Sequence, residues 1–292
     1  MTPLAAPEPV ELMAPTPQTL WGRPAVVNFA LGGLGAGLYV AAAVAAGFGP
    51  SPEVIIAAWL GPALVLAGFV AVATEAGRPL RGMRVLTRVL TSWMSRELWL
   101  GGAFALFAAS EFAVEVPGHR PLAALAAVGL ALAQGWILRE ARGIAAWDVP
   151  VMPLLFLSSA LVSGTGLLML LGAAQGRAPS DRGFAAVLVL LILHALVWQA
   201  FLNWSRDPTF VHATRPCREG RTRTVATVGG YLAPALAIAP ALAWPALAPA
   251  AALFAALLMI ASQIDAKAAI ILRVGQLRPI TIARLRPARR PR

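Results

Sequence analysis

The chain has 292 residues, of which 59% are hydrophobic and only 13% are charged, whereas about 25% are charged in an average soluble domain. This composition excludes an ordinary soluble fold and predicts an integral membrane protein. The formal net charge of +11 would suggest a nucleic-acid partner in a soluble chain, but in this apolar background it indicates positively charged cytoplasmic loops.

The first residues form a proline-rich segment without the basic start and apolar stretch of a signal peptide. No periodic apolar face runs through it, so it predicts an extended surface arm. The expected organisation is this arm over 1–23, a transmembrane domain over 24–272, and a basic cytoplasmic tail over 273–292.

Several segments that follow are apolar over about the 20 residues that a membrane-spanning helix needs. They are about 24–47, 53–76, 97–115, 121–140, 150–172, 183–202, 224–243 and 246–272, with only a short turn near Ala243–Pro245 between the last two. The fold class predicted is therefore an all-α integral membrane protein with eight transmembrane helices in two four-helix groups. Gly33 and Gly37 in the first span have the small-xxx-small spacing that is typical of close helix packing.

The positions of the basic residues support this topology. Of 24 lysines and arginines, 21 fall on the side of the N-terminus, and 3 fall on the other side, namely Arg120, Arg177 and Arg182. Positive residues concentrate in the cytoplasmic loops of membrane proteins. We therefore expect a multi-pass protein of the bacterial inner membrane with both termini in the cytoplasm.

The few cysteines and histidines limit the redox cofactors that this chain can hold. Cys217 is the one cysteine, which excludes an intrachain disulfide and a cysteine-ligated iron–sulfur cluster. Of three histidines only His194 lies deep in a span, so no bis-histidine haem is expected. Without haem or iron–sulfur cluster in this chain, any electron transfer must use a diffusible cofactor and a redox centre in a partner.

The joint between the second and third spans, TEAGRPLRGMRVLTRVLTSWMSREL, contains two carboxylates among several arginines. Glu75 lies where the second span meets this joint, and Pro79 ends that helix. Ionisable groups at membrane depth usually face protein or a water-filled cavity, so Glu75 can take up or deliver a proton. The alternative is a purely structural pair with Arg78, three residues later.

The rest of this joint predicts an interfacial helix and the start of the next span. Residues 80–92 combine apolar positions with arginines, as in a helix that lies among lipid headgroups or docks on an acidic partner. Ser95 can cap the third span, and Glu97 lies in its first turn, where negative charge is favourable. Trp93 fits the aromatic belt at the membrane interface.

Three separated stretches resemble the dimethyl sulfoxide reductase membrane-anchor family. EAGRPLR…TSWMSREL is similar to the family's joint between spans 2 and 3, TLWGRPAVVNFALGGLGAGLYV to its first span, and ILREARGIAAWDVPVMPLLF to its joint between spans 4 and 5. The resemblance covers most of residues 18–172. Within the family the chain looks most like the membrane subunit of phenylacetyl-CoA:acceptor oxidoreductases, and the family is distantly similar to polysulfide-reductase-type quinone subunits.

This resemblance implies a membrane anchor that exchanges electrons between a quinone, ubiquinone or menaquinone, and a partner iron–sulfur subunit. That partner is connected to a molybdopterin catalytic subunit. Glu75 takes the acidic or histidine position that the family associates with quinone. The residues that match the family's motifs are Arg78, Trp93, Ser95, Arg96 and Glu97 in the joint between spans 2 and 3. In the joint between spans 4 and 5 they are Arg142, Gly143, Trp147 and Asp148.

The resulting candidate quinone and proton residues are Glu75, Arg78, Trp93, Arg96, Glu97, Arg142, Trp147, Asp148 and His194. A quinone headgroup needs hydrogen-bonding groups at one membrane face, and its tail needs an apolar cleft. His194, near the middle of its span, is either a quinone ligand or a hydrogen-bonded core histidine. Asp265 and Lys267 either join the site or form a local charge pair, and Glu111 either begins a proton path or is held by hydrogen bonds.

The distribution of charged residues also predicts on which side of the membrane the partner subunits bind. If the partners dock beside the quinone site, the catalytic module faces the cytoplasm, and its substrate is an acyl-CoA such as phenylacetyl-CoA, or sulfite.

Two alternative functions remain open. One is a secondary transporter, although no internal repeat is evident and the charged groups gather at one face. The other is a purely structural membrane anchor without quinone chemistry.

Overall fold

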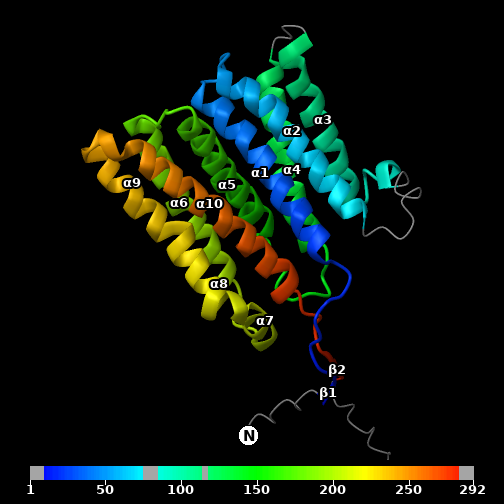
Figure 1. Cartoon of the computed structure of the whole chain (residues 1–292). Helices are drawn as coiled ribbons and strands as arrows, with labels where there is room; N and C mark the ends of the chain where they lie inside the picture. Colours follow the sequence, from blue (N-terminus) through cyan, green and yellow to red (C-terminus); the bar gives the residue numbers. More distant parts are fainter. Residues whose placement is uncertain (1–9, 75–84, 114–117, 283–292) are drawn as a thin grey trace, which may run out of the picture.

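The computed structural model describes residues 10–74, 85–113 and 118–282, which form a bundle of long helices with one small two-stranded sheet (Figure 1). The main helices are α1 (Arg23–Ala45), α2 (Pro52–Ala73), α3 (Trp93–Ala113), α4 (His119–Arg139), α5 (Met152–Ala174), α6 (Asp181–Leu202), α9 (Ala233–Ala243) and α10 (Ala248–Ala268). Shorter elements are β1 (Val10–Met13), α7 (Pro208–Arg218), α8 (Gly220–Thr224), η2 (Val225–Leu232), η3 (Pro245–Leu247), η4 (Ala269–Arg273) and β2 (Ile280–Ile282). The prediction of an all-helical membrane fold is confirmed.

Seven helical segments are long and apolar enough to cross a membrane among the residues described. They are α1, α2, α4, α5, α6, the continuous run Gly220–Ala243 and the run Pro245–Arg273. The predicted span over 97–115 corresponds to α3, which has 21 residues and packs against α2 and α4. Its Arg96, Glu97 and Glu111 lower its mean hydropathy, and it is not among the seven.

Local sequence explains where several helices begin. Ser51 and Ser180 precede α2 and α6, and each hydroxyl accepts a hydrogen bond from a backbone N–H of the first turn at 3.2 Å. These caps satisfy donors that a helix start otherwise leaves unpaired. Pro234 cannot donate a backbone hydrogen bond, and the backbone just before it takes the wider turns of the π-helix η2.

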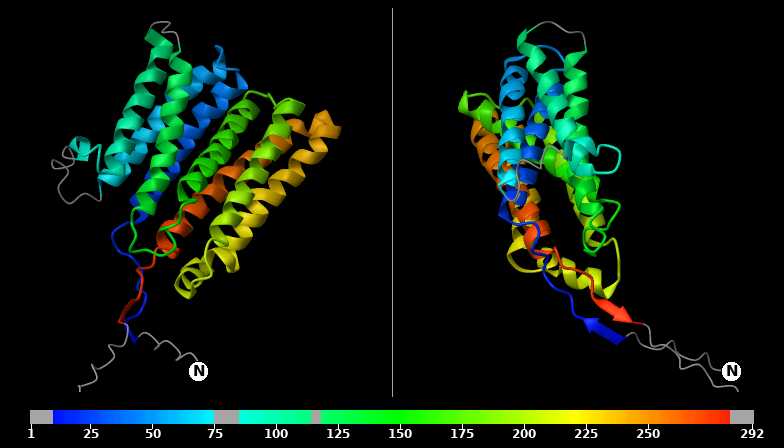
Figure 2. Two further views of the ribbon diagram at one scale, coloured as in Figure 1. Left: turned by 180° about the vertical axis from the view of Figure 1, so that it is seen from behind. Right: turned by 90° about the vertical axis from the view of Figure 1, so that its right-hand side faces the viewer.

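Helix α1 is central in the bundle and contacts α2, α4 and α5 (Figures 1 and 2). Its contact with α5 is close because both helices present glycine there. A Cβ atom on Gly37 would overlap the backbone of Ala160, and one on Gly164 would overlap the backbone of Gly37. Helix α5 in turn packs on α6 and α10, so α1 and α5 connect the two halves of the chain.

The two ends of the described chain meet in the small sheet. β1 pairs antiparallel with β2, and isolated bridges join Pro17 to Gln276 and Ile144 to Leu277. Both views of Figure 2 show this ribbon beyond the ends of the helices, and Figure 1 shows α7 at the same end of the bundle. The loop between α4 and α5 is therefore tied to the segment that follows η4.

Candidate functional site: a tryptophan-lined pocket at the start of α3

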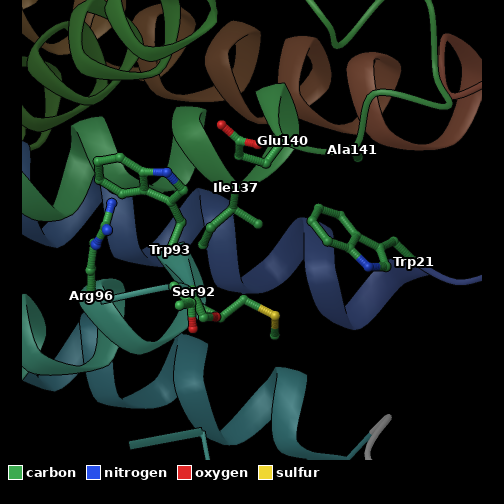
Figure 3. A pocket seen from close by; sticks show the side chains of 9 residues that line it. Trp21, Ser92, Trp93, Arg96, Ile137, Glu140 and Ala141 are labelled. Atoms are coloured by element: carbon green, nitrogen blue, oxygen red, sulfur yellow. The ribbon is translucent and has the colours of Figure 1, made fainter. Parts of the chain in front are cut away.

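A pocket of about 580 Å³ lies at this same end, between the start of α3, the end of α4 and Trp21, two residues before α1 (Figure 3). Its lining residues are Trp21, Thr91, Ser92, Trp93, Met94, Arg96, Ile137, Glu140 and Ala141. Figure 3 shows Ile137 between the indole rings of Trp93 and Trp21, with the Arg96 side chain beside Trp93. The volume is within the range of about 300–1,000 Å³ that is usual for small-molecule sites.

Two residues that line the pocket, Trp93 and Arg96, belong to a row of side chains in the order Arg96, Trp93, Trp136 and Arg139, here called the Arg–Trp stack. The rings of Trp93 and Trp136 are stacked, with centroids 5.0 Å apart and planes 6° from parallel. The guanidinium of Arg96 lies 4.2 Å from the Trp93 centroid, and that of Arg139 lies 4.3 Å from the Trp136 centroid. Cation–π contacts stabilise such pairs, so the stack fixes the start of α3 against the end of α4.

The segment before α3 is held by side chains from the helix itself. Ser95 donates a hydrogen bond to a backbone carbonyl within residues 85–90, and the Trp99 indole donates to another at 2.9 Å. Arg96 donates to two more, at 2.9 and 2.8 Å. The interfacial helix expected over 80–92 is, in its described part, a single 3-10 turn at residues 85–87, since these carbonyls bond to α3.

Glu97 lies behind the pocket, between α1, α3 and α4, and its side chain does not line the cavity. The residue is only 5% exposed. Its carboxylate accepts hydrogen bonds from the amides of Asn28 and Gln134, both at 3.1 Å. None of the ion pairs among the described residues includes Glu97. Ionisable groups at membrane depth are costly to bury, and the hydrogen bonds from these two neutral amides satisfy one oxygen of the Glu97 carboxylate.

The loop between α4 and α5 places three further candidates next to this pocket. Trp147 is buried, donates from its indole N–H to the carbonyl of Ile270 at 2.8 Å, and packs 5.4 Å from the ring of Trp21. Asp148 pairs with Arg278 at 3.0 Å. Arg142, with a mostly exposed side chain, lies 3.3 Å from the pocket residue Glu140. These contacts support the pocket rim from behind.

His194 is apart from this group. It is buried in α6, its Nδ1 lies 2.8 Å from the hydroxyl of Ser158, and it faces a different cavity between α5, α6 and α10. The structure thus gives His194 the geometry of a hydrogen-bonded core histidine. Glu75 and Arg78, the remaining two candidates, lie outside the described residues.

Two other acids have partners of their own. Glu111, near the opposite end of α3, binds His119 at 2.5 Å and Arg120 at 2.6 Å. Asp265 binds Arg273 at 3.1 Å, and the local pair that Asp265 could form with Lys267 is not among the ion pairs of the described chain. No group of three or more histidine, cysteine, aspartate or glutamate side chains with the geometry to hold a metal occurs in the described ranges.

Sequence reasoning missed Trp21, Trp136 and Glu140 as parts of the site. A signal existed for each, because all three stand within or beside the quoted joints. Trp136 and Arg139 also have the i,i+3 spacing that brings side chains together on a helix. That Trp21 meets the start of α3 depends on the packing of α1 against α4, which no local pattern reveals.

Comparison with known proteins gives one match. The family model described as "DMSO reductase anchor subunit (DmsC)" matches residues 23–205. No curated protein matches the chain. The matched residues run from α1 through α6 and include the Arg–Trp stack, Glu97 and the loop between α4 and α5.

Proposed function

Because the chain belongs to the family of DMSO reductase anchor subunits, we propose that it is the quinone-reactive membrane anchor of a molybdopterin/iron–sulfur oxidoreductase complex. In this role it passes electrons between quinone and a partner iron–sulfur subunit. The observation that carries the proposal is the tryptophan-lined pocket with the buried carboxylate of Glu97 behind it.

The pocket fits a quinone headgroup in size and chemistry. Trp21 offers an indole ring for contact with a flat headgroup, Trp93 offers its ring edge because its faces are covered by Arg96 and Trp136, and Met94 and Ile137 offer apolar contacts for the start of a tail. Arg96 supplies a cationic hydrogen-bond donor beside Trp93. Glu140, whose side chain is 44% exposed, lies at the rim where it can exchange protons with water.

A bound quinone supplies two-electron, two-proton chemistry, and the residues of this chain position it and handle the protons. Both amide hydrogen bonds to Glu97 reach Oε1, so Oε2 is the atom on which a proton would be held. Arg96 orients the ring through the Arg–Trp stack. Glu75 and Arg78 are proposed to complete the site from the joint between α2 and α3.

The topology proposed has eight crossings, with α3 as the eighth. β1 and β2 are paired, so the two chain ends lie on one side, which requires an even number of crossings. This supports adding α3 to the seven apolar segments. We propose a transmembrane domain over 24–272, with α1–α4 and α5–α10 as its two four-helix groups. The arginine distribution supports an inner-membrane protein with the arm and tail in the cytoplasm.

The β1–β2 ribbon is the proposed docking surface for the iron–sulfur subunit. Leu12, Met13 and Ile280 are 59%, 56% and 53% exposed there, beyond the ends of the helices. Exposed apolar patches of this kind mark interaction sites. Basic side chains around the nearby loops, such as Arg142, favour an acidic partner surface. The catalytic module then faces the cytoplasm, with an acyl-CoA such as phenylacetyl-CoA, or sulfite, as substrate.

The variant Glu97→Gln, introduced into the complete complex, tests this function. We expect quinone-dependent turnover to fall at least about tenfold, as when a general acid–base group is lost. Electron transfer from a soluble dye to the partner subunit should stay unchanged. Glu219→Gln, which removes an exposed acid paired with Arg215, is the control. Wild-type quinone turnover in Glu97→Gln would contradict the role of Glu97, and a purified complex without molybdenum and iron would contradict the function.

A further inference from the structure

Lys267 is the one lysine in the chain, and the other 23 of the 24 basic residues are arginines. It lies in α10 and is only 2% exposed. Arginine stays protonated in proteins, whereas the lysine ammonium can lose its proton. The single position occupied by lysine is therefore a buried one, where the ability to release a proton distinguishes it from arginine.

Among the described residues, no acid forms an ion pair with Lys267. Its ammonium nitrogen lies against α1, where a Cβ atom on Gly33 would be only 2.7 Å away. None of the ion pairs of the described residues includes Lys267, and Asp265, two residues earlier, is held by Arg273. A buried ammonium without a carboxylate needs other polar partners.

Lys267 lines a small cavity together with three other polar residues, Ser159 of α5, His194 of α6 and Gln263 of α10, and the rest of its wall is apolar, from Leu155, Phe156, Trp198, Ala266 and Ile270. The hydroxyl of Ser159 is buried and has no hydrogen-bond partner, and the equally buried side-chain oxygen of Gln263 lies beside His194 without a hydrogen bond of normal geometry. Buried polar atoms are normally paired with protein or ordered water. The cavity volume is about 10 Å³, close to the roughly 10–15 Å³ that one water needs by this measure.

We propose that this cavity is a hydration and proton-exchange site, in which one water molecule bridges Ser159, Gln263 and Lys267 and exchanges a proton with the lysine. The proton passes from Nζ of the ammonium to the water oxygen, and the electron pair of the broken N–H bond stays on the amine nitrogen. The reverse step restores the ammonium. Apart from Lys267, His194 is the one titratable side chain among the residues that line this cavity.

This site is independent of the tryptophan-lined pocket. The two cavities share no lining residue. Lys267 and Gln263 also lie beyond residues 23–205, which the anchor-subunit family matches. The inference therefore stands on this chain's own residues, and its test does not depend on quinone chemistry.

The single lysine makes a direct measurement possible in the full chain. After selective ¹⁵N-lysine labelling and reconstitution into lipid bilayers, the side-chain amine gives one solid-state NMR signal. We expect it to move between the ammonium and amine positions on alkaline titration, and to show a correlation with water. A signal fixed in one form throughout the titration would overturn proton exchange, and a missing water correlation would overturn the hydration site.

Two serines of α5 provide a matched pair of variants. Ser159→Ala removes an oxygen that lines the cavity, whereas Ser163→Ala removes a buried hydroxyl that already donates to the Ser159 carbonyl at 2.9 Å. The water correlation of Lys267 should weaken at least twofold in Ser159→Ala and persist in Ser163→Ala. Equal correlations in both variants would overturn the bridging role of Ser159.

Discussion

Arg96 has two structural roles at the pocket. Its guanidinium donates two hydrogen bonds to backbone carbonyls of the segment before α3 and lies over the ring of Trp93. A planar guanidinium can make these contacts at once, whereas an ammonium on a flexible stem cannot. The side chain thus connects the shape of the pocket rim to the Arg–Trp stack.

Replacing Arg96 by lysine should weaken quinone binding. Losing a charge-assisted hydrogen bond costs about 1.5–3 kcal/mol, so we expect the KM for quinone to rise about tenfold. Turnover with a soluble electron donor should remain unchanged. Arg215→Lys changes an exposed arginine of α7 and controls for the chemistry of the substitution. Steady-state kinetics of the complex checks this, and an unchanged KM would contradict the role of Arg96 at the site.

For single residues, the sequence predicted which side chains lie near the pocket better than it predicted the contacts that those side chains make. It selected Trp93 and Arg96, which line the pocket, but it offered no way to see that Glu97 turns inward to Asn28 and Gln134. Those contacts join residues far apart in the chain. They depend on how α1, α3 and α4 pack, which the spacing of residues within one helix does not determine.

Among the helix contacts, the packing of α1 against α5 depends most on a single small residue, Gly37. A Cβ on Gly37 would overlap the backbone of Ala160, which cannot move aside as a flexible side chain could. Close helix approach through small residues is what holds membrane bundles together. The small-xxx-small spacing that the sequence shows in the first span lies at this contact.

The variant Gly37→Ala should therefore destabilise the bundle. Overpacking of this kind typically costs about 1–3 kcal/mol, and we expect a clear drop in the Tm of the purified chain in detergent. Gly102→Ala in α3 is the matched control, since a Cβ there meets nothing within 4 Å, and its Tm should not fall. A Tm for Gly37→Ala equal to that of wild type would contradict the close contact.

Among the elements, long apolar helices were predictable and irregular backbone was not. Hydropathy marks α5 and α6 because their composition is uniform. It does not mark α3, where Arg96, Glu97 and Glu111 interrupt the apolar run. The 3-10 turn before α3 is held by side-chain hydrogen bonds from α3, for which a sequence pattern gives no signal, and Pro234 alone does not indicate that the backbone before it forms the π-helix η2.

For the whole molecule, the pairing of β1 with β2 brings the two ends of the described chain together, and cysteine labelling can test the proposed topology. Burial raises the pKa of the native Cys217 thiol to about 12 and leaves the residue 1% exposed, so it should not react with a maleimide. A membrane-impermeant maleimide should label Pro50→Cys, in the turn between α1 and α2, in intact spheroplasts. It should label Leu12→Cys and Ile280→Cys only after permeabilisation. The opposite pattern would contradict the cytoplasmic placement of both termini.

The overall arrangement was predictable in part because membranes constrain it. Span length and the arginine distribution predict the number and direction of crossings. The pairing of β1 with β2 was not predictable, because the strands are far apart in sequence and each is very short. The same holds for the pocket, which forms only where Trp21, the start of α3 and the end of α4 meet.

The most direct test of the account is photolabelling of the intact complex with a photoreactive quinone analogue, followed by mass spectrometry. The account predicts labelled residues within 91–96 and 137–141, with labelling suppressed by excess native quinone. Labelling confined to α6, α9 and α10, away from the tryptophan-lined pocket, would contradict it.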